Sequence, residues 1–124
     1  MEHKLYLNDK GNAYAVLVSH GFGAGFSTWN EKWMAYDRRV VEYWLAHKDN
    51  EQWMHDVHYL GTAANKEALD FFNNEFGIEP YLGGFNDIEL HWVRFNVAWE
   101  IKEYDGAETL EFMKDVDWTI FYKE

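Results

Sequence analysis

The segment from Tyr14 to Asn30 constrains the fold more than any other part of the chain, because a two-faced apolar run leads directly into a glycine-rich loop. Both faces of the run are apolar, one formed by Tyr14, Val16 and Val18 and the other by Ala15 and Leu17. A strand with this pattern is covered on both sides. We therefore expect it to be central to a sheet.

The loop after this strand is the first candidate binding site. Gly21, Gly23 and Gly25 alternate with other residues, and glycine accepts positive φ and lets a ligand or another chain approach the backbone. The aromatic residues expected to contact such a partner are Phe22, Phe26, Trp29 and Trp33. The alternative is a bulged strand end that folds aromatic side chains back onto the core, which is the commoner use of strand glycines.

No enzyme motif accounts for the loop. A phosphate-binding P-loop would end in Gly-Lys-Ser/Thr, and a dinucleotide fingerprint would space its glycines differently. The stretch 16–23 is similar to the His-Gly oxyanion loop of α/β-hydrolases. However, the sequence has no G-x-S-x-G motif, and its 124 residues are too few for that fold. We therefore expect a protein that is not an enzyme, with no catalytic residues and no cofactor.

The charge of the chain limits the partners that it can bind. Acidic residues outnumber basic ones by 22 to 11, which gives a net charge of -11 and argues against direct nucleic-acid binding. The charge either keeps the protein soluble or forms an acidic face that competes with nucleic acid for a basic partner. Seven tryptophans exceed the needs of a core of this size, and surplus aromatic residues gather at interfaces and base-stacking pockets.

The composition also predicts where the protein acts. Cysteine is absent, the N-terminal residues lack the apolar stretch of a signal peptide, and no apolar run reaches membrane-spanning length. We expect a soluble intracellular protein with no disulfide and no membrane contact. Since no linker or repeat divides the sequence, residues 1–124 should form a single domain.

Local patterns predict a helical insertion after the first strands. A strand at 4–7 should form a hairpin with the central strand. Three segments have helical spacing of apolar residues, namely 38–48, the stretch between Asn50 and Gly61, and 66–76. The predicted caps are Asp37, Asn50, and Asn65 or Thr62, and the predicted glycine stops are Gly61 and Gly77.

Strands are predicted after Pro80. Residues 87–92 alternate between polar and apolar, and a type I′ turn at Asp105–Gly106 would place Glu103 opposite Glu108. The same register pairs Tyr104 with Ala107, Ile101 with Leu110 and Trp99 with Phe112. A last strand is expected at 117–122. The predicted fold is α+β, an antiparallel sheet of five or six strands with a two- or three-helix insertion packed on one face.

The predicted core combines the apolar faces of these elements. It consists of Val16, Val18, Val41, Leu45, Leu69, Phe72, Ile88, Leu90, Trp92, Ile101, Leu110 and Ile120.

Two polar groups are further candidate sites. Glu103, Asp105 and Glu108 at the hairpin tip would attract a Lys or Arg of a partner, although well-solvated carboxylates are the favoured explanation of the pattern. Glu51, His55 and His58 would share one helix face, with types of ligand that hold a metal ion. The commoner explanation of that spacing is a solvated helix face, so no metal site is predicted.

Several blocks, in this order, resemble a family of small acidic bacteriophage proteins of unknown function. They are Gly23–Asn30, Ala35–Asp37, Tyr81–Gly84, Glu89–Val93 and Glu103–Glu108. The sequence departs from the family pattern at Phe26, where Trp is usual, and at 94–97, where a Pro- and Gly-containing turn is usual. The resemblance implies a phage origin and supplies no catalytic residues.

These observations predict a phage accessory protein that acts in the host cytoplasm by binding and inhibiting a host defence component with a basic surface. Anti-CRISPR and anti-restriction proteins that mimic DNA are of this type. One alternative is a sponge for a nucleotide signal, with phosphate on the loop N–H groups and the base on an aromatic ring. Another is a structural phage protein. The oligomeric state stays open.

Overall fold

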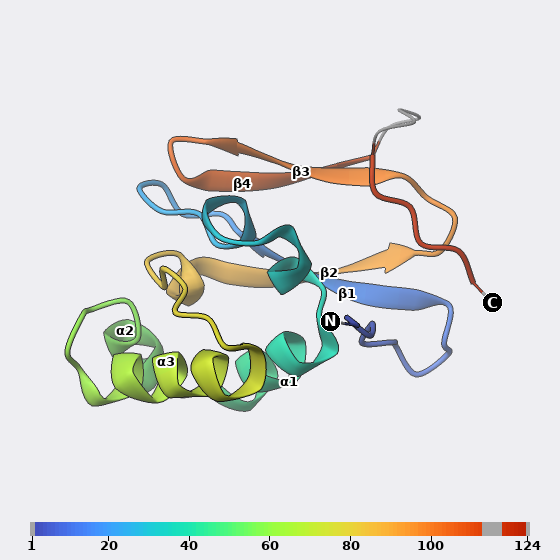
Figure 1. Cartoon of the computed structure of the whole chain (residues 1–124). Helices are drawn as coiled ribbons and strands as arrows, with labels where there is room; N and C mark the ends of the chain where they lie inside the picture. The colour runs from blue at the N-terminus through green and yellow to red at the C-terminus, as the bar shows by residue number, and fades with distance from the viewer. Residues whose placement is uncertain (1, 113–117, 124) are drawn as a thin grey trace.

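The computed structural model describes residues 2–112 and 118–123, and within them the fold is α+β (Figure 1). Two antiparallel sheets of two strands each are present, one formed by β1 (Ala13–Ser19) and β2 (Ile88–Arg94) and the other by β3 (Trp99–Tyr104) and β4 (Ala107–Phe112). The helices are α1 (Arg38–His47), α2 (Glu51–Asp56) and α3 (Ala63–Phe76), with short 3-10 turns η1 (Ser27–Trp29), η2 (Lys32–Ala35) and η3 (Phe85–Asp87).

The strand β1 lies in the middle of three layers. The helices cover one side of the β1–β2 sheet, and the β3–β4 hairpin covers the other (Figure 1). Ala15 and Leu17 belong to the core on the helical side, whereas Tyr14, Val16 and Val18 belong to the core beneath the hairpin. The predicted covering of both faces is therefore confirmed. The predicted central place in a sheet is wrong, because in the described residues β1 pairs with β2 and has only the isolated Leu7–Tyr14 bridge on its other edge.

The prediction of one sheet with five or six strands is wrong. The second hairpin does not extend the edge of the first sheet, because Trp99 and Ile101 pack their side chains against the face formed by Tyr14 and Val16. Stacking two sheets face to face buries apolar side chains of both sheets. Those side chains would stay exposed to water if the second hairpin were hydrogen-bonded to the edge of the first sheet.

The two terminal segments contribute single bridges in place of strands. Leu5 bridges to Asp37 and Leu7 to Tyr14, so the N-terminal hairpin is present only as isolated pairs. At the other end Thr119 bridges to Trp99. Position 117, where the last strand was predicted to begin, lies outside the described residues.

The starts of the three helices and the end of α3 follow local sequence, whereas α2 ends at Asp56, before the predicted stop at Gly61. The side chains of Asp37, Asn50 and Thr62 accept hydrogen bonds from backbone N–H groups of the first turns of α1, α2 and α3. Gly77 ends α3 with φ 69°, which glycine adopts without a Cβ clash. The longest of the three described helices is α3, and no described helix is long and apolar enough to cross a membrane.

Most of the predicted core lies inside, with one clear exception. Val16, Val18, Val41, Phe72, Ile88 and Ile101 are buried, and Leu45, Leu69, Leu90, Leu110 and Ile120 are half-buried. Trp92 is 48% exposed, so its assignment to the core is wrong. It shares the helical face of β2 with Ile88 and Leu90, but the helices cover only the part of β2 that carries those two residues.

Candidate functional site

A buried carboxylate organises the end of the molecule where the glycine-rich loop, residues 20–26, meets the β3–β4 turn. Glu108 is fully buried, and its Oε1 accepts the N–H of Ser19 at 2.9 Å. Its Oε2 accepts the N–H groups of Phe26 at 2.8 Å and Thr28 at 3.1 Å, and also the Thr28 hydroxyl. The carboxylate thus holds the start and the end of the loop on β4.

The prediction that Glu108 is a solvated or partner-binding carboxylate is therefore wrong. The hairpin register is as predicted, with Glu103 opposite Glu108 and positive φ at both Asp105 and Gly106. Although the two glutamates are paired across the strands, Glu103 stays exposed while Glu108 enters the loop. Four donors around Glu108 compensate its charge, so the cross-strand pair does not require a cation.

Glycine is required where the loop touches the turn. The N–H of Gly23 donates to the carbonyl of Asp105 at 2.7 Å. A Cβ on Gly106 would lie 2.3 Å from the backbone nitrogen of Ala24, and one on Gly84 would lie 2.5 Å from the carbonyl oxygen of Gly25. The chain segments approach so closely that no side chain fits at Gly84 or Gly106. The close approach was predicted for the loop glycines, but a Cβ on Gly23 would meet nothing within 4 Å.

Exposed aromatic residues gather around this junction. Phe22, on the loop, is 76% exposed, and Tyr104, at the turn, is 79% exposed. The loop and the turn lie side by side (Figure 1) and are joined by the hydrogen bond from Gly23 to Asp105. Trp29 is partly exposed, stacks on Tyr81 with ring centroids 5.6 Å apart, and donates its indole N–H to Glu103 at 2.9 Å. We name Phe22, Trp29, Tyr81, Glu103, Tyr104 and Asp105 the aromatic–acidic end.

Not all the predicted contact residues belong to this surface. Phe26 is fully buried and packs edge-on against Phe85, so it is a core residue. Trp33 is half-buried and lies between His3 and Phe76, at ring-centroid distances of 4.3 Å and 4.7 Å. Phe22, Trp29, Glu103 and Asp105 are the predicted side chains that reach solvent here.

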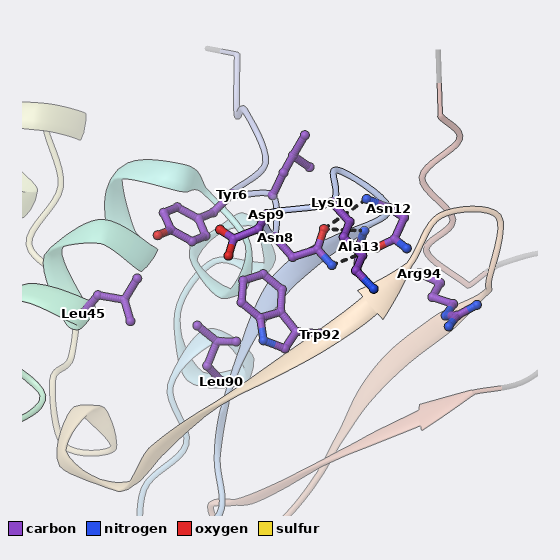
Figure 2. A pocket seen from close by; sticks show the side chains of 11 residues that line it. Tyr6, Asn8, Asp9, Lys10, Asn12, Ala13, Leu45, Leu90, Trp92 and Arg94 are labelled. Carbon is purple, nitrogen blue, oxygen red and sulfur yellow. Dashed lines mark hydrogen bonds between the residues drawn. The ribbon is translucent and has the colours of Figure 1, made fainter.

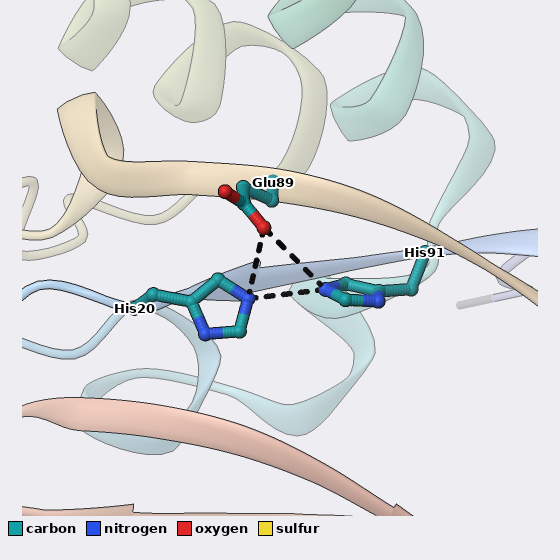
Figure 3. Close-up of side chains that lie close together, drawn as sticks. All are labelled: His20, Glu89 and His91. Carbon is teal, nitrogen blue, oxygen red and sulfur yellow. Dashed lines mark hydrogen bonds and ion pairs between the residues drawn. The ribbon is translucent and has the colours of Figure 1, made fainter.

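Three side chains that the sequence analysis did not select meet beside the loop. The Nε2 atoms of His20 and His91 lie 3.0 Å apart, and Glu89 Oε2 lies 3.3 Å from the first and 4.0 Å from the second (Figure 3). Burial lowers the pKa of His91, the nearby His20 lowers it further, and Glu89 opposes both effects. The available signal was the Glu-x-His spacing, which places both side chains on one face of a strand.

Glu51, His55 and His58, for which no metal site was predicted, are not among the described groups with metal-ligand spacing. His55 contacts Asp56 at 3.0 Å, and its ring centroid is 6.3 Å from that of His58. Within residues 2–112 and 118–123, the group whose ligand atoms all lie within 4.8 Å of one another is His20, Glu89 and His91.

An open groove of about 610 Å³ lies on the other side of β2 from this cluster (Figure 2). Leu45, Leu90 and Trp92 form its apolar part, and polar side chains of the 8–12 turn and Arg94 form its rim. Tyr6 stacks beside Trp92 with ring centroids 6.2 Å apart. The groove thus combines an accessible aromatic ring with a guanidinium group.

Comparisons with protein-family models, with curated proteins and with solved structures give no match.

Proposed function

We propose that this protein is a binding protein whose aromatic–acidic end attaches to a basic surface of another protein. The observation that carries the proposal is the exposure of Phe22 and Tyr104 beside the carboxylates Glu103 and Asp105. Large exposed aromatic side chains supply much of the energy of protein interfaces, and exposed carboxylates select Lys- and Arg-rich partners.

The aromatic–acidic end is shaped before any partner arrives. The Glu108 carboxylate fixes both ends of the loop, and the bond from Gly23 to Asp105 joins the loop to the turn. A surface that is already ordered loses little conformational entropy on binding, which favours affinity. In the described residues neither Glu103 nor Asp105 has an ion-pair partner, so both charges are available to a cation.

The partner that fits this chemistry best is a nucleic-acid-binding protein. Such proteins expose clustered Lys and Arg side chains. The net charge of -11 would steer this chain towards them. Together with the resemblance to small acidic phage proteins, this supports inhibition of a host defence nuclease in the host cytoplasm.

The proposal is tested by biolayer interferometry of the immobilised chain against purified restriction endonucleases and RNA-guided nucleases. We expect binding to at least one of them, competition by its DNA, and weakening as salt rises. Replacing both Phe22 and Tyr104 with Ser should weaken binding about 30-fold or more, as expected for interface hot spots.

A matched control is Leu60→Ser. Leu60 is 89% exposed and lies in the α2–α3 connection, so the change removes an exposed apolar side chain elsewhere on the molecule. Its affinity should equal that of the unsubstituted chain. Binding that is indifferent to salt, or that Leu60→Ser weakens as much as the double substitution does, would contradict the proposal.

A nucleotide-binding function is the second candidate, and the groove beside Trp92 is the observation that favours it. The N–H groups of Phe26 and Thr28 already donate to Glu108, so the loop holds an internal carboxylate where a phosphate was predicted. Trp92 offers a stacking surface, and Arg94 offers a cation for phosphate. Calorimetry with cyclic dinucleotides and ADP-ribose tests this candidate, and absence of heat with all of them would exclude it.

A further inference from the structure

We propose that His20, Glu89 and His91 form a binding site for a divalent transition-metal ion such as Zn²⁺. Their three ligand atoms are separated by 3.0, 3.3 and 4.0 Å. A point equidistant from all three lies about 2.0 Å from each atom. Zinc bonds to imidazole nitrogen and carboxylate oxygen at about 2.0–2.2 Å. These distances suit the bond lengths of zinc, and small shifts of the exposed side chains would bring the bond angles towards tetrahedral.

The three side chains are held by paired strands. Glu89 and His91 are two residues apart on β2 and point to the same face, opposite Val18 and Val16 of β1. His20 follows β1 directly, and its N–H donates to the carbonyl of Asp87 at 3.2 Å. Two ligands therefore lie on β2, and the third is the first residue after β1, where its backbone hydrogen bond to Asp87 holds it beside them.

The donor set determines which ions would bind. Two neutral imidazoles and one carboxylate suit zinc and neighbouring first-row ions, whereas Mg²⁺ prefers oxygen ligands. The side chains of His20, Glu89 and His91 are 37%, 68% and 36% exposed, so an ion can reach them from solvent. With three protein ligands, a further coordination position would stay open to water, as in zinc sites that bind a substrate.

This site is independent of the proposed partner surface. None of its ligands belongs to the aromatic–acidic end, although His20 is the first residue of the glycine-rich loop. A bound ion would join the end of β1 to β2 and would stabilise the base of the loop. The metal site and partner binding can therefore be tested separately.

The experiment is isothermal titration calorimetry of ZnCl₂ into the untagged chain, in a buffer that does not coordinate metal. We expect one ion per chain, a rise in melting temperature with zinc, and neither effect with MgCl₂. Titration with Co²⁺ provides a second readout, because two imidazole ligands give a visible absorption spectrum that differs from that of the hydrated ion.

Single substitutions His20→Ala, His91→Ala and Glu89→Gln should each weaken zinc binding about tenfold or more, since loss of a direct ligand costs at least as much as loss of an outer-shell partner. Glu89→Gln keeps the size of an exposed side chain, so it separates loss of the ligand from loss of the fold. The control is the double substitution His55→Ala, His58→Ala. It removes one histidine from α2 and one from the residues that follow this helix.

The control variant should bind zinc like the unsubstituted chain. Absence of zinc binding would overturn the proposal. Binding that survives all three single substitutions, or that the His55 and His58 control abolishes, would place the metal elsewhere and overturn the proposal.

Discussion

Substitution of Glu108 by Gln should destabilise the protein far more than its position in a hairpin suggests. The Glu108 carboxylate accepts three backbone N–H groups and one hydroxyl in a fully buried site. An amide has only one acceptor oxygen. If that oxygen faces Phe26 and Thr28, the amide nitrogen faces the N–H of Ser19, so at least one buried donor loses its partner.

The magnitude follows from this count of bonds. A hydrogen bond to a charged group contributes about 1.5–3 kcal/mol, and a buried donor without a partner costs about 1–3 kcal/mol. Because one oxygen still serves the other donors, we expect Glu108→Gln to lower the free energy of unfolding by about 2–4 kcal/mol. Truncation to Ala removes every acceptor and should cost about 3–5 kcal/mol. Both values are large beside the total of about 5–15 kcal/mol for a single domain.

The assay is urea denaturation followed by tryptophan fluorescence, with Glu103→Gln as the matched control. Glu103 lies directly opposite Glu108 in the hairpin but is exposed, so its substitution should change the free energy of unfolding by less than about 0.5 kcal/mol. Equal effects of the two substitutions, with an unchanged m-value, would refute the assignment of Glu108 as the anchor of the loop.

Two other predictions concern backbone fit and alkaline pH. Gly106→Ala should destabilise the protein by well over 1 kcal/mol, because φ is +88° and the new Cβ would lie 2.3 Å from the backbone nitrogen of Ala24. The control is Gly11→Ala, at φ +68° in open space, which should cost only about 1 kcal/mol in the same urea assay. Burial raises the pKa of Tyr14 to about 12 despite the hydrogen bond from Trp99 Nε1, so the folded state keeps this proton when the unfolded chain loses it. Stability should therefore fall between pH 10 and 12, by up to about 3 kcal/mol from this group. Burial also raises the pKa values of Tyr36 and Tyr43, so Tyr14→Phe should reduce this fall without abolishing it, and an unchanged pH dependence would contradict the assignment.

The sequence by itself determined the local features of this protein. Helix caps at Asp37, Asn50 and Thr62 depend on hydrogen bonds to backbone groups two or three residues away. The turn at Asp105–Gly106 needs two residues that accept positive φ, and it sets the whole register of β3 and β4. The apolar pattern of β1 showed that both of its faces would be covered.

Only the tertiary structure decided what covers β1 and where the polar residues go. The second hairpin could extend the first sheet or stack on it, and the strand pattern is the same in both arrangements. Ser19 and Glu108 are 89 residues apart, and His20 and His91 are 71 residues apart. The alternation and spacing of residue types report on structure within a few residues of the chain. They do not show that one glutamate of a cross-strand pair is buried against a loop, or that two distant histidines meet. Those outcomes depend on burying a large apolar area while the buried backbone N–H groups keep acceptors.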